Sequence, residues 1–372
     1  MNILHIDPSR RDLSRRFLRL PFRLYADAPQ WVPPMAFDAA RMLDSRRNPF
    51  YQHSAAAFFL AEEGGRDVGR LAVLDNAHYN SYNATRTAFF YLFECEPNPQ
   101  AALGLFAAAG EWASSRGLTE IIGPKGFTAL DGMGLLVRGF EHRPALGIPY
   151  NPPYYADLIS EAGFAPDGDT LSGRVDRNFQ LSDKIRRAAQ LVQKRIGLRV
   201  ERFTSRAELR AFVPRLAGLY NAALEGTSGN TPLTPDEARS MAQQIIWFAD
   251  PRLIKLIFKG DELAGFLFAY PDISAAIQRS GGRLWPLGWA DLLTELRRTK
   301  CLNVNGMGVL PRFRGLGATA LLFCELYDSV LAGGFEFADV VQIGAENARM
   351  LNEIRGLEID FNKIHRMFRR KF

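Results

Sequence analysis

The stretch VLPRFRGLGATALL, residues 309–322, passes from an apolar run through two arginines and two glycines into a helix-forming run. Gly315 and Gly317 have no side chains, so a turn here exposes consecutive backbone N–H groups at the start of a helix. Such N–H groups and the helix dipole bind anions, and a pyrophosphate fits them. Arg312 and Arg314 add permanent positive charge for phosphate oxygens. The pattern predicts an anion-binding loop in preference to a plain tight turn with two surface arginines.

The same stretch resembles the acetyl-CoA-binding signature of the GCN5-related N-acetyltransferase (GNAT) superfamily, Arg/Gln-x-x-Gly-x-Gly/Ala, which reads RFRGLG at residues 312–317. The resemblance implies that the preceding strand pairs its backbone with the pantetheine arm, while the loop holds the pyrophosphate. It also implies a second cofactor segment in ENARML, residues 346–351, where Asn347 would open a helix near the thiol end. The implied cofactor-binding set is Gly308, Val309, Arg312, Arg314, Gly315, Leu316, Gly317, Ala318 and Asn347.

Acyl transfer from a thioester to an amine needs a group that takes a proton from the amine, donors for the developing oxyanion and a proton for the departing thiolate. Backbone N–H groups where strand 301–310 splays from its neighbour would serve the oxyanion. No motif fixes the base, and several candidates stay open. They are Glu225 after a helix, Asp339 and Glu346 flanking a strand, Tyr327 and Tyr220 as proton donors to the thiolate, and His53 in NPFYQH.

Each catalytic candidate also has an ordinary structural interpretation. Glu225 would be a solvated carboxylate at a helix end, Asp339 or Glu346 a capping group, and Tyr327 a core residue. A structural histidine is the bland interpretation of His53. No cluster of histidine, cysteine or carboxylate residues has the spacing of metal ligands, so the sequence disfavours a catalytic metal.

The elements around these residues are predicted to repeat one order twice: hairpin, strand, helix, strand, helix. The first set spans residues 55–76, 87–95, 99–117, 118–126 and 151–164. The second set spans residues 253–270, 301–311, 315–334, 337–345 and 347–357, preceded by a strand and two helices and followed by a strand near 365–370. The sequence therefore predicts an α+β fold of two tandem GNAT-like units, each a mixed, mostly antiparallel sheet flanked by helices.

This order of elements divides the chain into three segments. Residues 1–39 are a basic, proline-rich flank, either solvated or touching a membrane surface through its arginines. Residues 40–190 form a unit without the cofactor signature; its acidic ECEPNP replaces the loop, so we expect this unit to shape the acceptor or acyl pocket. Residues 195–372 form the cofactor-binding unit, with an insertion at 272–300. That insertion gathers leucines, tryptophans and basic residues, and either packs between the units or forms a lid for an acyl chain.

Composition limits the class of protein. The chain has 372 residues, 47% hydrophobic, with a net charge of +6 and a pI near 9.3, which favours anionic partners. Three scattered cysteines form no disulfide framework, so a reducing compartment is expected. No apolar run reaches the ~18 residues of a membrane span and no secretory signal is evident. We expect a cytoplasmic protein, peripheral at the inner membrane if it touches one, and no nucleic-acid partner, because no such motif occurs.

A resemblance over the full length narrows the function. YADAPQWVPP, NPPYYADLISEAGF and LWPLGWADLL resemble one bacterial tandem group of the superfamily, which includes the bacterial ceramide synthases. The resemblance implies transfer of an acyl group from acyl-CoA, or from acyl carrier protein, to a lipid-like amine such as a sphingoid base. Two alternatives stay open: acetyl-CoA-dependent acetylation of a small amine, and a non-catalytic scaffold that binds acyl-CoA.

Overall fold

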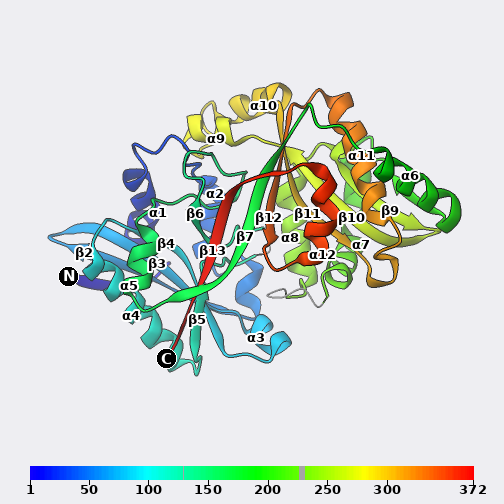
Figure 1. Cartoon of the computed structure of the whole chain (residues 1–372). Helices are drawn as coiled ribbons and strands as arrows, with labels where there is room; N and C mark the ends of the chain where they lie inside the picture. Colours follow the sequence, from blue (N-terminus) through cyan, green and yellow to red (C-terminus); the bar gives the residue numbers. More distant parts are fainter. Residues whose placement is uncertain (129, 226–230) are drawn as a thin grey trace.

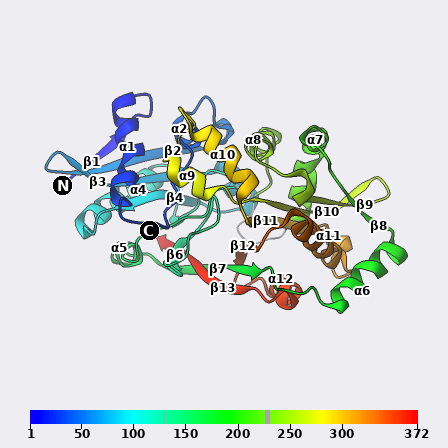
Figure 2. The same ribbon diagram turned by 90° about the horizontal axis from the view of Figure 1, so that it is seen from above.

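The computed structural model describes residues 1–128, 130–225 and 231–372. In this part of the chain a single mixed sheet of thirteen strands runs through the molecule (Figure 1), in the order β1-β2-β3-β4-β5-β13-β7-β12-β11-β10-β9-β8, with β6 paired to β13. Helices cover both faces; Figure 2 shows α1, α2, α9 and α10 on one side and α5, α6 and α11 on the other. The predicted α+β class is confirmed.

The first half of the sheet is built from the N-terminal elements. Its strands are β1 (Asn2–Ile6), β2 (Ala55–Glu63), β3 (Arg66–Asp75), β4 (Thr87–Cys95), β5 (Glu120–Gly123) and β6 (Leu135–Arg138). Its helices are α1 (Arg11–Leu24), α2 (Ala36–Leu43), α3 (Ala77–Asn83), α4 (Pro99–Ser115) and α5 (Tyr155–Glu161). Strand β1 lies within the segment that the sequence suggested as a flank, and it pairs with β2 at the edge of the sheet. Phe17 of α1 is fully buried, so this segment belongs to the core.

The second half carries the predicted cofactor loop. Its strands are β8 (Leu198–Glu201), β9 (Ile254–Lys259), β10 (Glu262–Pro271), β11 (Cys301–Val309) and β12 (Phe337–Gly344). Its helices are α6 (Asp183–Leu191), α7 (Arg206–Ala223), α8 (Pro235–Ile246), α9 (Ser274–Ser280), α10 (Gly288–Arg298), α11 (Ala318–Gly333) and α12 (Ala348–Ile354). Helices α9 and α10 form the insertion, which stands above the sheet in Figure 1.

Two long strands join the halves. Strand β7 (Ala165–Asp176) pairs with β12 of the second half, and β13 (Asp360–Lys371) pairs with β7, β5 and β6. These strands cross the centre of the molecule in Figure 1 as green and red arrows. Hydrogen bonds therefore run without a break from one unit into the other, and the two units share one sheet.

Each half contains one parallel strand pair, and all other pairings in the described chain are antiparallel. Strands β4 and β5 pair over three positions, Thr87–Phe89 with Glu120–Ile122. Strands β11 and β12 pair only as far as Val304 and Val340, after which β12 continues along β7 while β11 follows β10. Within the described chain, the backbone of residues 305–309 thus pairs with no strand on the side facing away from β10. The predicted splay in strand 301–310 is present.

Candidate active site

The turn between β11 and α11 leaves its N–H groups available. Helix α11 begins after Gly317, whose φ is +92° and whose position offers no side-chain cap. Within the described chain, the N–H groups of Gly315, Leu316, Gly317 and Ala318 donate no hydrogen bond. A Cβ at Gly315 would meet nothing within 4 Å, whereas one at Gly317 would come within 2.6 Å of Val192. The turn is therefore open to a ligand on one side and packed on α6 and its extension on the other, as a diphosphate site requires.

The two arginines of the loop do different things. Arg314 donates from Nε to the carbonyl of Val309 at 2.9 Å and from Nη2 to the carbonyl of Ala223 at 2.8 Å. Its guanidinium thus fastens the loop to the end of β11 and to the end of α7. Arg312 is exposed and pairs with Glu262. The sequence suggested phosphate contacts for both; the structure gives Arg314 a positioning role and pairs Arg312 with a carboxylate.

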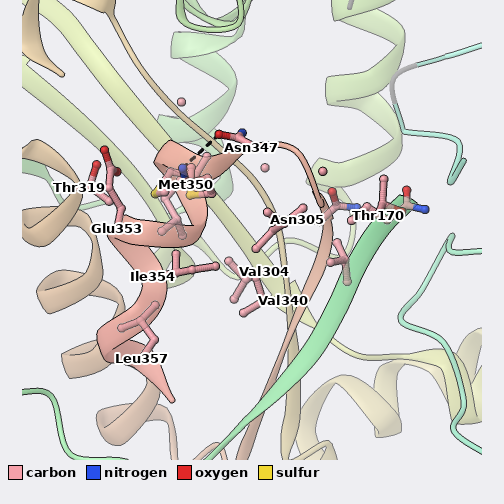
Figure 3. Close-up of a pocket in the computed structure, with 18 of the residues that line it drawn as sticks. Thr170, Val304, Asn305, Thr319, Val340, Asn347, Met350, Glu353, Ile354 and Leu357 are labelled. Atoms are coloured by element: carbon pink, nitrogen blue, oxygen red, sulfur yellow. Dashed lines mark hydrogen bonds between the residues drawn. The ribbon is translucent and has the colours of Figure 1, made fainter. Parts of the chain in front are cut away.

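A cavity of about 1140 Å³ opens where β11 and β12 part. Figure 3 shows Val304 and Val340 side by side at its floor, with Asn305 and Thr170 beyond them and α12 along one wall. The cavity continues into the N-terminal half, where Tyr79, Phe89, Ile122, Lys125, Met133 and Met367 line it. The cavity therefore extends well beyond the cofactor loop and the place where β11 and β12 part.

Six of the predicted residues outside the loop line this cavity: Gly308 and Val309 on β11, and Glu225, Tyr327, Glu346 and Asn347. Asn347 caps α12 by accepting a hydrogen bond from the N–H of Met350 at 3.1 Å, drawn as a dashed line in Figure 3. The hydroxyl of Tyr327 donates to the carbonyl of Phe179 at 3.2 Å. Glu225 and Glu346 are exposed; the glycine-rich loop after Glu225, residues 226–230, lies outside the described residues.

Two catalytic candidates lie away from this cavity. Asp339 is buried on β12, where Oδ1 lies 3.2 Å from Nε of Arg174 and 4.0 Å from Nζ of Lys363. His53 places Nδ1 2.6 Å from Oγ of Ser54 and Nε2 3.2 Å from a carboxylate oxygen of Glu237. Neither residue lines this cavity: Asp339 is an ion-paired core carboxylate, and His53 joins α8 to the N-terminal half. A catalytic role for either residue stays a prediction.

Comparison with known proteins agrees with this geometry. The chain is 31% identical over 308 residues to the bacterial ceramide synthase of Caulobacter vibrioides, covering 81% of this chain and 78% of that protein. It is 27% identical over 368 residues to the protein YghO of Escherichia coli, covering 96% and 92%. A tandem GNAT protein from clavulanic acid biosynthesis shares the fold with a TM-score of 0.57 at 13% identity, covering 100% and 98%. No family model matches the chain.

The chain belongs to the family of this bacterial ceramide synthase, and it has the fold of tandem GNAT proteins.

The N-terminal GNAT-like unit closes the position that corresponds to the cofactor loop. At the end of β4 the N–H of Cys95 donates to the hydroxyl of Tyr155 at 3.0 Å, and the hydroxyl of Tyr154 donates to the carbonyl of Cys95 at 2.8 Å. The next helix, α4, is capped by the side chain of Asn98, which accepts from the N–H of Ala101. The backbone groups that a cofactor would use are thus taken by side chains.

Three residues that the sequence analysis did not select line the cavity of about 1140 Å³ where it reaches the N-terminal unit. Lys125 and Asp131 lie between β5 and β6, and Asn305 follows the last paired position of β11. Burial lowers the pKa of Lys125 to about 8 and raises the pKa of Asp131 to about 6. The stretch GPKGFTALDGMG carried a detectable signal, because a lysine and an aspartate within a glycine-rich loop between strands are candidates for function.

Proposed function

We propose that this protein is an N-acyltransferase that moves a long acyl group from a coenzyme A thioester to a lipid-like amine. The observation that carries the proposal is the open N–H loop at Gly315–Ala318, whose flanking residues Arg314 and Thr319 line the cavity of about 1140 Å³. The loop suits the diphosphate of coenzyme A, and the free edge of residues 305–309 suits an amide-containing pantetheine arm. A donor bound in this way aims its thioester past Val304 toward the N-terminal unit.

The size of the cavity favours a long acyl chain over an acetyl group. The part that extends into the N-terminal unit is lined by the largely apolar side chains of Tyr79, Phe89, Ile122 and Met367. Charged side chains line it too, namely Lys125, Asp131, Asp167 and Arg369. Burial of a hydrocarbon chain there is favourable by about 0.8 kcal/mol for each CH₂ group. An acetyl group would leave this extension unused.

The relative that is 31% identical is a ceramide synthase, which supports a sphingoid base as the acceptor in this protein. Of the proton-transfer groups that the sequence predicted, Glu225 and Glu346 line the cavity, and Tyr327 is a candidate proton donor to the thiolate if its hydrogen bond to Phe179 exchanges. Acyl carrier protein presents the same pantetheine arm and thioester but no adenosine diphosphate group. The diphosphate-binding loop therefore favours coenzyme A as the carrier.

Thermal unfolding and product analysis test the proposal together. We expect palmitoyl-CoA to raise Tm more than acetyl-CoA at equal concentration, because a ligand at 100 times its Kd stabilises the fold by about 2.7 kcal/mol. With sphinganine present, palmitoyl-CoA should be consumed and an N-acyl product should appear by mass spectrometry. Consumption of acetyl-CoA alone would support acetylation of a small amine. If no CoA thioester shifts Tm, the coenzyme A proposal is wrong.

We also propose that the insertion rests on an anionic membrane surface, from which a lipid amine could enter. On α10 and the turn before it, Trp285, Leu287 and Leu293 are 80%, 73% and 52% exposed. Exposed arginines lie beside them, at 283, 297 and 298, and none of the three forms an ion pair within the described chain. Aromatic side chains with flanking arginines are typical of membrane-surface contacts. None of the described helices has the length and apolar character of a membrane span.

Vesicle sedimentation tests this contact. The triple variant Trp285→Ser, Leu287→Ser, Leu293→Ser should lose most of its binding to vesicles rich in phosphatidylglycerol. The matched control is Leu103→Ser with Leu331→Ser, which removes leucines that are 39% and 52% exposed on other elements. Equal sedimentation of the two variants would contradict a contact through the insertion.

A further inference from the structure

A second cavity, of about 700 Å³, lies between the N-terminal half of the sheet and helices α1, α2, α8 and α9. This volume is in the range of about 300–1,000 Å³ that binding pockets of small molecules occupy. Its wall is mainly apolar and comes from both units. Among the side chains that form it are Leu18, Phe22, Trp31, Tyr91, Phe127 and Ile245.

The two cavities meet at two residues. Among the described residues, only Asp131 and Asn305 line both. Asn305 is the first residue of β11 beyond the splay, and its side chain donates to the hydroxyl of Tyr270 at 3.2 Å. The inner end of the second cavity therefore lies beside the position at which the donor thioester is expected.

Carboxylates mark this inner end. Asp131 accepts a hydrogen bond from the N–H of Thr128 at 2.8 Å, and Asp38 on α2 also lines the second cavity. Oδ1 of Asp38 is buried and has no hydrogen-bond partner among the described residues. A buried oxygen without a donor is unfavourable, and an ammonium group would satisfy it.

The loop that carries Asp131 is held by a strained residue of the other unit. Gln342 on β12 has a φ of +51°, a left-handed conformation that is costly for a glutamine. Its Oε1 accepts from the N–H of Met133 at 3.1 Å, and its Nε2 donates to the carbonyl of the same residue. The backbone N–H of Gln342 is fixed by Ser172 at 2.9 Å. Strand β12, which bounds the donor cavity, thus also sets the position of the Asp131 loop.

We propose that the second cavity binds the hydrocarbon chain of a long-chain primary amine, and that Asp131 holds the amino group at the junction and takes its proton. This inference rests on the proposed function and names the acceptor's site. An acyl thioester carries no cation, so the carboxylates at the inner end suit the amine and not the acyl chain. Exposed arginines at the outer end, Arg11, Arg15 and Arg19 on α1, favour an entrance that faces anionic lipid.

The chemical step balances with these groups. The ammonium form of the acceptor transfers one proton to the Asp131 carboxylate, and the neutral amine attacks the thioester carbonyl. A C–N bond forms, the C–S bond breaks, and the second amine proton goes to the departing thiolate. The products are an N-acyl amide and the free thiol, and the proton on Asp131 returns to solvent.

A cavity-filling substitution tests the site of the chain. Gln244 on α8 is half-buried and lines the second cavity, whereas its neighbour Gln243 is exposed and does not. In Gln244→Phe we expect the KM for hexadecylamine to rise at least tenfold while the KM for butylamine stays the same. Gln243→Phe, the matched control, should behave as the parent protein. An unchanged KM for hexadecylamine in Gln244→Phe would overturn the proposal.

The pH profile tests Asp131. The titratable and charged groups around it are Asp38 and Arg41 on α2, Tyr91 on β4 and Lys125 on its own loop. Since burial raises the pKa of Asp131 to about 6, its carboxylate form, and with it kcat/KM, should be lost as pH falls through this value. In Asp131→Asn we expect kcat to fall by about 100-fold and the remaining activity to lack that acid limb. Asp38→Asn should mainly raise the KM for the amine.

A stability measurement separates this role from a structural one. A raised pKa means that ionisation of Asp131 disfavours the fold, so its contribution to stability is lost as pH rises through about 6. Asp131→Asn should therefore have a higher Tm at pH 7.5 and an unchanged Tm shift with palmitoyl-CoA. A lower Tm together with normal kcat would overturn the proposal. If the parent protein acylates no amine at all, the proposed function fails instead.

Discussion

The two parallel strand pairs, β4–β5 and β11–β12, have a similar backbone arrangement. They differ in the chemistry of the turn that follows the first strand of each pair. After β11, glycines leave a row of N–H groups without partners, and α11 begins without a cap. After β4, Glu96 is held by Arg23 and Arg66, and α4 begins with the Asn98 cap. The comparison teaches that the strand arrangement alone makes no cofactor site; the site depends on which backbone donors the side chains leave unused.

The difference extends to the cavities. Beside the open splay lies the cavity of about 1140 Å³, and beside the closed one the tyrosines of α5 fill the space next to β4. The N-terminal unit also lines the second cavity, which lies under α1 and α2. We infer that one unit has kept the donor site while the other supplies walls for the substrates.

The largest expected effect comes from placing a negative charge in the open turn. Gly315→Glu should weaken binding of coenzyme A by at least 100-fold, because a carboxylate would repel the diphosphate and a side chain would enter a space that is empty in this structure. The matched control is Gly64→Glu in the β2–β3 turn, where φ is +59° and a Cβ also meets nothing within 4 Å. Isothermal titration and Tm measure the two effects. Equal binding by both variants would contradict the site.

A smaller effect is expected from opening the closed turn. Tyr155→Phe removes the acceptor for the N–H of Cys95 and a donor to Glu94, both buried, so the free energy of unfolding should fall by about 1–3 kcal/mol. Denaturant unfolding checks the loss. Coenzyme A affinity should not change, and a change in affinity would mean that the first unit takes part in cofactor binding.

The smallest effects are expected from substituting the two arginines of the loop, and the two substitutions should differ in their effect on stability and on cofactor affinity. Arg314→Ala loses two hydrogen bonds to backbone carbonyls, each worth about 1 kcal/mol, and should lower both Tm and cofactor affinity. Arg312→Ala loses one exposed ion pair and should change stability by less than about 0.5 kcal/mol. If Arg312→Ala weakens cofactor binding more than Arg314→Ala, then Arg312 leaves Glu262 to contact the phosphates.

Local patterns of the sequence predicted much of the fold. The hairpin around Gly64-Gly65, the helix after Thr234-Pro235 and the loop at Gly315 and Gly317 depend on residues that are neighbours in the chain. The pairing of β13 with β5 could not be predicted in this way, because Phe368 and Gly123 are partners 245 positions apart. Their contact follows from the assembled sheet and not from either segment.

The candidate site shows the same difference between local patterns and long-range contacts. The cofactor loop is one continuous segment with a recognisable spacing, so the sequence shows its residues together. The junction of the two cavities combines Asp131, Asn305 and Gln342 from three separate strands and loops. Asn305 and Gln342 are ordinary residues in their own segments, and Asp131 stands out only by its place in a glycine-rich loop, so the sequence does not show that the three lie together. His53 and Asp339 show the converse, because their motifs or positions were suggestive while Asp339 is paired in the core and the half-buried His53 is paired with Glu237.

The position of β13 has a consequence for synthesis on the ribosome. This strand follows every other strand of the sheet in the chain, yet it lies in the middle of the sheet between β5 and β7. Until it emerges from the exit tunnel, both neighbours present unpaired edges, which are prone to association with other chains. Nascent protein should therefore depend on chaperones late in translation, and a stalled chain lacking this strand should be a strong substrate for proteolysis.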